Sequence, residues 1–574
     1  MIERIPILDI SPVIFFGGEF VPAKAVAGEE VTISATIIRE GHAGLKAYAV
    51  LANSLGKEIS RSVMREVWQG TDRYEGVLTP PSEGEFTFFI EATDPEHVDE
   101  VASKSASFPI RAERVRALFG SWYEFFPRSE GATKNAAGTF ATAAKRLPAV
   151  ADMGFDILYL PPVHPIGYSH RKGANNSLTA LPSDPGVPWA IGNKDGGHDS
   201  INPELGTMAD FENFVKEAKK CGLEIAMDLA LQTSPDHPWV KTNPDWFSYR
   251  ADGTIAYAEN PPKKYQDIYP INFDKDYEGF LAEVLRIIKL WVSKGVTVFR
   301  VDNPHTKPLH FWQELLALVY KESPDVIFLA EAFTRPAMMH ALGKAGFQQS
   351  YTYFTWRTSK QELINYGYEV ARDTSAFFRP NFWVNTPDIL PFHLQSGIPA
   401  MFALRSVLAA TLSPSWGMYA GYELYEHRAM KESGEEYVDS EKYQIRIRDW
   451  EGAAKKGLTL APFITSLNQI RRDHPALQRL RNLIFHNTGS DSIIAYSKRD
   501  GNDLVLVVVN LDPTFAQETT VYWDLKALGI DEPTFTVTDL LDASTFTWSA
   551  NTFIRLDPSR PAGKVAHIAT VNLK

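Results

Sequence analysis

The stretch VTVFRVDNPH, residues 296–305, decides how the rest of the chain is interpreted. Its apolar residues predict a short buried strand that ends on Arg300 and Asp302. Side chains alternate along a strand, so these two residues are expected to point to the same face. A guanidinium beside a carboxylate favours the ionised form, and an ionised carboxylate fixed at a strand end can act as a nucleophile.

Two further carboxylates follow predicted strands, at intervals of one or two strand–helix units. Glu331 ends the run VIFLAE (residues 326–331), and Asp388 follows NTP (residues 385–387). In a barrel of parallel strands, all the carboxyl ends face one pocket. Retaining glycosidases and transglycosylases use one ionised carboxylate and one protonated carboxyl group, roughly 5 Å apart. The three residues therefore predict chemistry at the anomeric carbon of a sugar.

Each carboxylate also has a purely structural interpretation. Asp302 could cap a following helix, Glu331 could be a buried carboxylate paired with an arginine, and Asp388 could be a turn residue. Three such coincidences in barrel register, beside Arg300 and His305, are the less favoured explanation.

Length, charge and cysteine content limit the class of protein. A chain of 574 residues is expected to form two to four domains. A net charge of −12 argues against a nucleic-acid partner. The N-terminus has no apolar signal core and no long apolar run suggests a membrane span. A single cysteine, Cys221, cannot form an internal disulfide, so a cytoplasmic location is expected.

Three domains are predicted from the patterns along the chain. Residues 1–112 alternate in polarity, as in EFTFFIE (residues 85–91), and predict an immunoglobulin-like β-sandwich. Residues 113–475 alternate strands with amphipathic helices and predict a (β/α)8 TIM barrel, of the α/β class, with insertions after strands 2 and 3. A doubly wound sheet is the alternative, but no Gly-rich loop follows the first strand. Residues 476–574 predict a C-terminal β-sandwich without helices.

The combined motifs resemble the alpha-amylase superfamily, glycoside hydrolase family 13. The FRVD run (residues 299–302), the strand before Glu331 and the loop of Asp388 match its nucleophile, acid/base and transition-state-stabiliser motifs. The run GHDSINPELGT (residues 197–207) resembles its substrate loop.

Two departures from the usual amylase pattern narrow the resemblance. They are DLALQTSPDHPW (residues 228–239) and TPD (residues 386–388), and both look like the bacterial alpha-1,4-glucan:maltose-1-phosphate maltosyltransferase family. Further matches are WYEFFPRS (122–129), HRKG (170–173), KKYQDIYP (263–270) and DNPHTKP (302–308). The resemblance covers nearly the whole chain.

This resemblance implies a retaining glycosyltransferase that moves maltosyl units from α-maltose 1-phosphate to α-1,4-glucans and releases phosphate. Asp302 would form the β-maltosyl intermediate, Glu331 would act as acid and then base, and Asp388 would stabilise the transition state. The family's donor-binding positions fall on Lys172, Gln232, Asp267, Asn303, Lys442 and Tyr443. A phosphate leaving group needs hydrogen-bond donors or positive charge nearby, which adds Lys263 and Tyr265 as candidate contacts. Arg300 is expected beside the nucleophile.

Two of these positions have competing interpretations. Lys442 could be a solvated helix lysine, and Lys172 could belong to a mobile surface loop. A hydrolase or another transglycosylase on the same fold is one rival function. A catalytically inactive glucan-binding module is another, although such modules usually lose one of the three carboxylates.

No cofactor is expected. His305 and His310 have no third ligand at helical spacing, which argues against zinc, and clustered oxygen ligands for calcium are not identified. Family members usually carry a helical segment before the first barrel strand that contributes to homodimer contacts. Here FPIR (residues 108–111) runs almost directly into that strand, so the usual dimer geometry is not expected to carry over.

Overall fold

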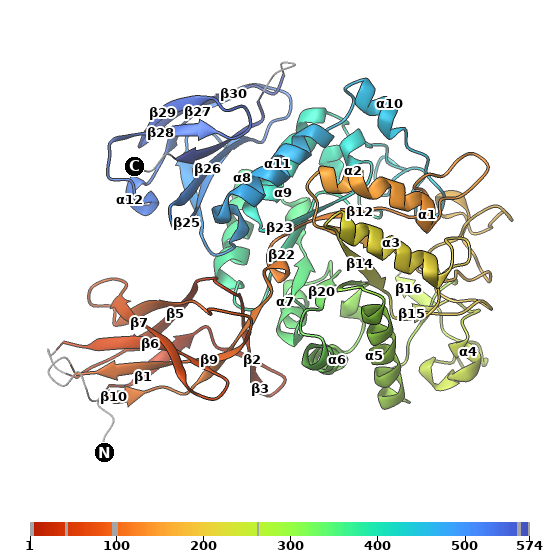
Figure 1. The fold of residues 1–574 in the computed structure, drawn as a ribbon, viewed down its shortest axis with the longest axis horizontal. Coiled ribbons are helices and arrows are strands. Elements are labelled where there is room, and N and C mark those ends of the chain that lie inside the picture. Colours follow the sequence, from red (N-terminus) through yellow and green to blue (C-terminus); the bar gives the residue numbers. More distant parts are fainter. Residues whose placement is uncertain (1–4, 41–43, 95–100, 261–262, 560–563, 572–574) are drawn as a thin grey trace.

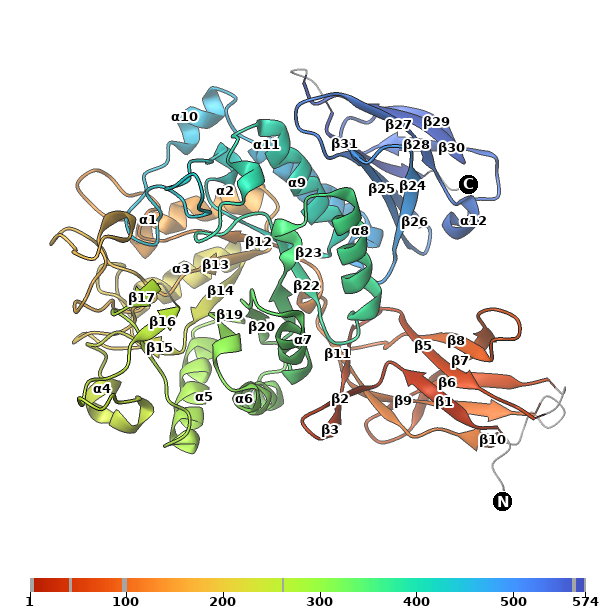
Figure 2. The same cartoon turned by 180° about the vertical axis from the view of Figure 1, so that it is seen from behind.

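The computed structural model describes residues 5–40, 44–94, 101–260, 263–559 and 564–571. Along the chain, a barrel follows an N-terminal part rich in β-structure and precedes a C-terminal part of the same kind (Figure 1). Both flanking parts lie on the side of the barrel away from α4 (Trp239–Thr242), as the opposite view also shows (Figure 2).

The central part is a closed barrel whose paired strands are all parallel. Its strands are β12 (Gly120–Glu124), β13 (Ile157–Leu160), β14 (Glu224–Leu229), β19 (Val298–Val301), β20 (Ile327–Ala330), β21 (Gln349–Tyr351), β22 (Pro380–Trp383) and β23 (Ser415–Tyr419). The predicted barrel is therefore confirmed, and the doubly wound sheet is wrong.

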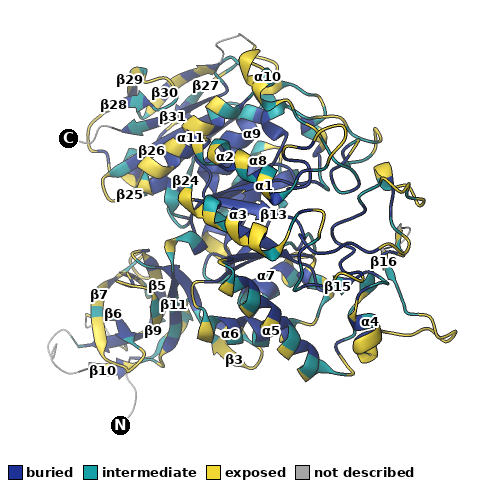
Figure 3. Cartoon of the chain, turned by 45° about the vertical axis from the view of Figure 1, so that its right-hand side comes forward, coloured by how far each residue is buried: buried dark blue, intermediate teal, exposed yellow. Residues whose placement is uncertain are grey.

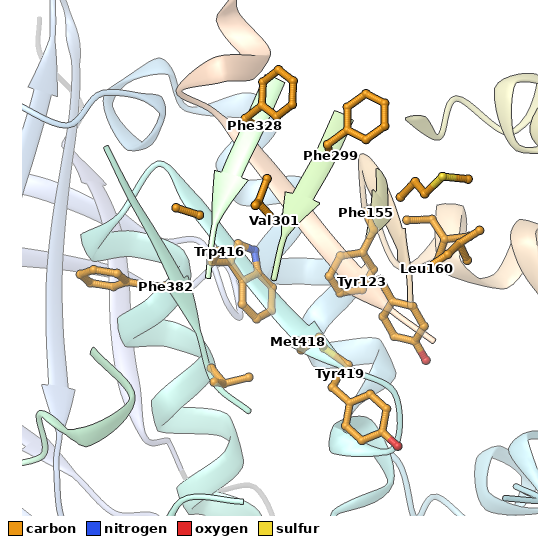
Figure 4. Packing of buried hydrophobic residues seen from close by; sticks show 14 of the residues in the cluster. Tyr123, Phe155, Leu160, Phe299, Val301, Phe328, Phe382, Trp416, Met418 and Tyr419 are labelled. Carbon is orange, nitrogen blue, oxygen red and sulfur yellow. The ribbon is translucent and has the colours of Figure 1, made fainter. Parts of the chain in front are cut away.

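Side-chain alternation on β19 divides the barrel interior from its outer layer. Phe299 and Val301 belong to the core between strands and helices, and Phe299 stacks on Phe328 of β20 with ring centroids 5.5 Å apart (Figure 4). Val298 belongs to the separate cluster inside the barrel. Arg300 therefore points into the barrel, as the two-residue period requires.

Helices surround the barrel, with exposed residues on their outer faces and buried residues along the strands, as α3 and α11 show (Figure 3). The main helices are α1 (Phe140–Ala143), α2 (Leu147–Asp152), α3 (Met208–Lys220), α5 (Tyr277–Ser293), α6 (Leu309–Glu322), α7 (Pro336–Ala345), α8 (Lys360–Tyr368), α9 (Pro399–Leu412), α10 (Trp450–Lys455) and α11 (Ala461–Asp473). The buried face of α5 contains the apolar residues at a 3.6-residue period. Among the described residues, no helix combines the length and the hydropathy that crossing a membrane requires.

Three long segments extend from the carboxyl ends of the strands and surround the pocket described below. Residues 161–207 separate β13 from α3, and residues 230–276 separate β14 from α5. The second segment contains β15 (Gln232–Thr233) paired with β18 (Tyr269–Pro270), and β16 (Ala258–Asn260) paired with β17 (Lys263–Tyr265). Residues 420–449 separate β23 from α10.

The N-terminal strands pair in the order β1-β5-β8-β7-β6-β9-β11-β4, with β10 on β9 and a separate hairpin of β2 and β3. Their bounds are β1 (Ile7–Ser11), β2 (Ile14–Phe16), β3 (Glu19–Val21), β4 (Ala23–Val26), β5 (Val31–Ile37), β6 (Lys46–Asn53), β7 (Glu58–Glu66), β8 (Arg73–Leu78), β9 (Gly84–Thr93), β10 (Val101–Lys104) and β11 (Phe108–Glu113). A single 3-10 turn (Val115–Ala117) separates β11 from the first barrel strand.

A buried ion pair joins this N-terminal part to the barrel. Arg379, which precedes β22, pairs with Glu113 at the end of β11, and both side chains are almost fully buried. The same guanidinium donates to the carbonyl of Ala25 in β4 at 2.8 Å. Arg379 thus connects the barrel to two N-terminal strands.

The C-terminal sheet has the order β29-β28-β31-β26-β25-β24-β27-β30 and lies beside α8, α9 and α11 (Figures 1 and 2). Its strands are β24 (Leu483–Thr488), β25 (Ile493–Asp500), β26 (Asp503–Asn510), β27 (Gln517–Tyr522), β28 (Thr534–Asp539), β29 (Thr545–Ser549), β30 (Asn551–Leu556) and β31 (Ala566–Val571). A short helix, α12 (Leu525–Leu528), contradicts the prediction that this part has no helix. Asp524 caps it and Gly529 ends it in the left-handed region, a signal too short to give helical periodicity.

Candidate active site

One guanidinium connects three carboxyl groups from three neighbouring strands. Arg300 Nη1 lies 2.9 Å from Asp302 Oδ1 and 2.7 Å from Asp228 Oδ2, and Nη2 lies 3.0 Å from Glu331 Oε1. Asp302 makes no helix cap, since the following turn begins at Asn303 without a side-chain cap. The arrangement places the carboxyl groups of Asp302 and Glu331 on one cation, a pairing of the kind that two-carboxylate chemistry at a sugar carbon uses.

Glu331 follows β20 directly and has the properties of a general acid. Its Oε2 accepts a hydrogen bond from the backbone N–H of Asn303 at 3.2 Å. Burial raises the pKa of Glu331 to about 8, and the nearby Asp302 also raises it, while Arg300 opposes the rise. Asn303 occupies the left-handed region with φ 42°, which brings its N–H towards this carboxyl group.

Asp228 is a further member of the cluster and was not among the predicted site residues. It lies in β14, and its Oδ2 accepts bonds from Tyr159 Oη at 2.5 Å and Trp189 Nε1 at 3.2 Å. Burial raises the pKa of Asp228 to about 7. The sequence contains a pattern that predicts Asp228 as a site residue, because it is a carboxylate at a strand end, as Asp302 and Glu331 are.

Asp388 approaches the cluster from the loop after β22. Lys442 Nζ lies 2.8 Å from Asp388 Oδ1, and the Asp388 carboxylate raises the pKa of Lys442. Lys442 lies outside any helix, in the segment between β23 and α10, so the alternative of a solvated helix lysine is wrong. Tyr443 beside it is buried.

The carboxylates open into a cavity of about 520 Å³, a volume suited to a small ligand. The cavity is lined by Lys172, Gln232, Tyr265, Asp267, Asn303, Lys442 and Tyr443 together with Asp302, Glu331 and Asp388. Arg300 lies beneath them and is buried. Lys172 is 5% exposed, so it is not a surface-loop lysine. Lys263 begins β17, but its side chain lies outside the described residues.

A buried arginine holds two of the long segments together beside the cavity. Arg128 Nη2 donates to the carbonyls of Glu441 and Lys442, at 2.6 and 3.2 Å, and Nη1 donates to the carbonyl of Gly186 at 2.9 Å. Glu441 is itself fully buried and pairs with Arg448 at 2.8 Å. These contacts fix the backbone that carries Lys442.

Three other residues of the cavity wall were not predicted to line it. Trp189, Phe273 and Lys307 lie there together with the predicted set, and of these only Lys307 belongs to a motif noted in the sequence. Trp189 and Phe273 come from the long segments, where no strand or helix period reports which side chains turn inward. Among the described residues, no group of three or more His, Cys, Asp and Glu side chains is arranged to hold a metal ion.

Comparisons with known proteins agree with these observations. A family profile described as "Alpha-1,4-glucan:maltose-1-phosphate maltosyltransferase, domain N/S" matches residues 3–107, and one described as "GLGE, C-terminal" matches residues 485–571. The alpha-1,4-glucan:maltose-1-phosphate maltosyltransferase 2 of Streptomyces coelicolor is 49% identical over 646 aligned residues, covering 99% of this chain and 96% of the relative. The alpha-1,4-glucan:maltose-1-phosphate maltosyltransferase of Mycolicibacterium smegmatis is 44% identical over 683 aligned residues, covering 99% of this chain and 97% of the relative.

Solved structures resemble the chain in fold. A cyclomaltodextrinase has a TM-score of 0.64 at 15% identity and covers 96% of this chain and 98% of its own. The noncanonic maltogenic alpha-amylase AmyB from Thermotoga neapolitana has a TM-score of 0.59 at 19% identity and covers 80% of this chain and 99% of its own. The alignments with the two maltosyltransferases span 646 and 683 residues, more than the 574 residues of this chain, so these two relatives contain residues that it lacks.

Proposed function

The chain belongs to the alpha-1,4-glucan:maltose-1-phosphate maltosyltransferase family, and from that premise we propose that it transfers maltosyl units from α-maltose 1-phosphate to the non-reducing end of α-1,4-glucans. Phosphate is the leaving group. The observation that carries the proposal is the shared contact of Asp302 and Glu331 with Arg300, at the base of a cavity that also contains lysines.

The first step forms a covalent intermediate. A carboxylate oxygen of Asp302 attacks C1 of the reducing-end glucose, and the bond from C1 to the phosphate oxygen breaks with its electron pair on that oxygen. Glu331 gives its proton to the departing phosphate, for which its raised pKa suits it. The product of this step is a β-maltosyl ester on Asp302.

The second step transfers the sugar to the acceptor. Glu331, now ionised, takes the proton of the glucan 4-hydroxyl, whose oxygen attacks C1 and displaces Asp302. Two inversions leave the α configuration unchanged. Asp388, held by Lys442, hydrogen-bonds sugar hydroxyls and stabilises the positive charge of the oxocarbenium-like transition state.

The remaining lining residues bind the donor in this proposal. Lys172, Gln232, Asp267, Asn303 and Tyr443, with Tyr265, provide hydrogen bonds and positive charge around the maltosyl and phosphate groups. Their common position on one cavity supports these roles.

Several properties of the whole chain belong to the same proposal. We place domain boundaries near residues 113 and 475 and assign the flanking parts as β-sandwiches, the N-terminal one immunoglobulin-like. The single cysteine supports a cytoplasmic location. A homodimer belongs to this proposal through the family resemblance alone, and the short link between β11 and β12, without the helical segment usual in the family, implies that its contacts differ from the usual ones.

Acceptor-dependent phosphate release tests the function. Purified protein is incubated with α-maltose 1-phosphate, with and without maltohexaose, and both inorganic phosphate and glucan length are measured. We expect phosphate release only with acceptor and products longer by two glucose units. Rapid starch hydrolysis without consumption of maltose 1-phosphate would instead establish the hydrolase. Absence of any turnover, with glucan binding intact, would establish the inactive binding module.

A further inference from the structure

Two histidines outside the cavity join two of the long segments that surround it. His198 lies in the segment between β13 and α3, and His237 lies in the segment between β14 and α5. Both are buried, and His198 Nδ1 lies 3.1 Å from His237 Nε2. Neither residue lines the cavity, and neither has a role in the proposed steps. The pair therefore connects the sequence motifs at residues 197–207 and 228–239 from outside the cavity.

The groups at the two ends of the pair determine where each proton lies. The backbone N–H of Trp239 donates to His237 Nδ1 at 3.1 Å, so this nitrogen carries no proton. His198 Nε2 lies 2.8 Å from the carbonyl oxygen of Ala230, which can only accept, so this nitrogen carries one. Between the rings, His237 Nε2 then donates to His198 Nδ1. One directed hydrogen-bond chain thus runs from a backbone N–H to a backbone carbonyl through two neutral imidazoles.

The hydrogen-bond chain requires both rings to be neutral. A proton added to His237 Nδ1 would face the N–H of Trp239, and a proton added to His198 Nδ1 would face the N–H of His237. Burial lowers the pKa of His198 to about 4 and that of His237 to about 2, so both rings are neutral at pH 7. The direction of the chain is therefore fixed at neutral pH.

The surrounding residues hold the two rings in place. His198 stacks on Trp239 with ring centroids 4.7 Å apart and an interplanar angle of 8°. A Cβ built on Gly197 would lie 2.2 Å from His237 Nε2, and one built on Gly192 would lie 2.1 Å from its Cδ2. Glycine at these two positions thus leaves the space that the His237 ring fills. The ring is confined by the same segment that carries its partner His198.

The acceptor at the end of the hydrogen-bond chain leads to the cavity wall. The carbonyl oxygen of Ala230 accepts from His198 Nε2 at 2.8 Å and from the backbone N–H of Gln232 at 2.9 Å. Gln232 lines the cavity, and its Nε2 lies 3.5 Å from the carbonyl oxygen of Trp189, which also lines it. The hydrogen-bond chain therefore ends on the turn that carries Gln232 and holds this turn against the segment after β13.

We propose that His198 and His237 are positioning residues for Gln232, which they reach through the carbonyl of Ala230. The assignment rests on the proposed function, in which Gln232 binds the maltosyl donor. In this role the pair neither contacts the donor nor transfers a proton. It fixes the turn after β14 before the donor arrives, so that donor binding does not have to order this turn.

Variants at His237 separate hydrogen bonding from ring packing. His237→Phe keeps a ring but removes the donor to His198 and the acceptor for Trp239. His237→Gln keeps an N–H donor near the position of Nε2. Gly197→Ala leaves both histidines intact and displaces the His237 ring, since the added Cβ would lie 2.2 Å from Nε2. His310→Phe is the control, because the His310 side chain is 77% exposed and lies outside the cavity.

In His237→Phe, KM for maltose 1-phosphate should rise about 3- to 10-fold, the effect of losing a neutral hydrogen bond, while kcat changes by less than about twofold. A purely structural role would instead lower the amount of active protein, and with it kcat, and leave KM unchanged. His237→Gln should recover part of the loss, Gly197→Ala should raise KM as His237→Phe does, and the control should match wild type.

A double-mutant cycle tests whether the pair acts through Gln232. In a Gln232→Ala background, His237→Phe should raise KM by less than about twofold further, because the side chain that the pair positions is then absent. A rise of equal size in the wild-type and Gln232→Ala backgrounds would overturn the assignment.

An unchanged KM in folded His237→Phe, with or without a fall in kcat, would also overturn the assignment. If His237→Phe does not fold, Gly197→Ala takes its place in the same cycle, and an unchanged KM there has the same meaning. Failure of the proposed function is distinct, because wild type itself would then release no phosphate from maltose 1-phosphate.

Discussion

The acid role proposed for Glu331 predicts a particular pH dependence of the first chemical step. Only the protonated carboxyl group can assist phosphate departure, and burial raises the pKa of Glu331 from 4.5 to about 8. At pH 7 about nine-tenths of the enzyme is therefore in the active form. kcat/KM should be flat below about pH 7, half-maximal near pH 8 and then fall about tenfold per pH unit.

The size of the effect follows from the site. Burial, which raises the pKa of Glu331 from 4.5 to about 8, makes ionising this carboxyl group cost about 5 kcal/mol more than in water. Glu331→Gln keeps an acceptor for the N–H of Asn303 but has no proton to give, so kcat/KM for maltose 1-phosphate should fall by about 10²- to 10⁴-fold. The fall of kcat/KM at alkaline pH, here called the alkaline limb, should also disappear in this variant.

The assay is initial phosphate release at saturating acceptor, from pH 6.5 upward because the second ionisation of a phosphate monoester lies near pH 6. α-Maltosyl fluoride, whose leaving group needs less help from an acid, is the matched control. With it, Glu331→Gln should accumulate a maltosyl ester that mass spectrometry locates on Asp302. If Glu331→Gln keeps the wild-type alkaline limb, the assignment of that limb to Glu331 is wrong. If the ester is found on another residue, the assignment of Asp302 as the nucleophile is wrong.

Three further predictions concern binding, the domain junction and the loops. Lys442→Met removes the partner of Asp388, so kcat/KM for maltose 1-phosphate should fall at least about tenfold, and an unchanged value would contradict the binding role. Arg379→Met removes the ion-pair partner of the buried Glu113 and should cost about 3–5 kcal/mol in a denaturant-unfolding measurement, whereas a cost below about 1 kcal/mol would show that the ion pair does not hold the junction. Arg128→Met should raise KM for maltose 1-phosphate and, because it leaves three carbonyl groups without their donor, should also lower the unfolding temperature in calorimetry, and an unchanged KM would count against its action on the loop.

The parts of the site that lie on regular strands could be predicted from the sequence. Alternation alone placed Arg300 and Asp302 on one face, and strand order placed Glu331 one strand away. Asp228 obeys the same rule, and it was overlooked because only its difference from the amylase pattern was considered. Periodicity is sufficient where the backbone repeats, because each side chain then has only one of two directions.

The loop residues could not be derived in this way. Asp388 lies five residues beyond the end of β22, and Lys442 comes 54 positions later in the chain, yet they form an ion pair. No period connects them, and only the family resemblance indicated Lys442. Lys307 was visible in the motif after Asp302, but its contact with two carbonyls depends on the left-handed backbone at Asn303.

The bonds of Arg128 also relate donor binding to the order of folding. The carbonyl of Glu441 that it binds lies 313 positions away in the chain. Closing so long a loop costs entropy before any contact repays it. The pairing of β12 with β23, which joins Gly120 to Ser415, already closes a loop of similar length, and Arg128 and Glu441 follow these two strands. We therefore expect the segment that carries Lys442 to dock with or after barrel closure, so that donor binding is acquired no earlier than the closed barrel.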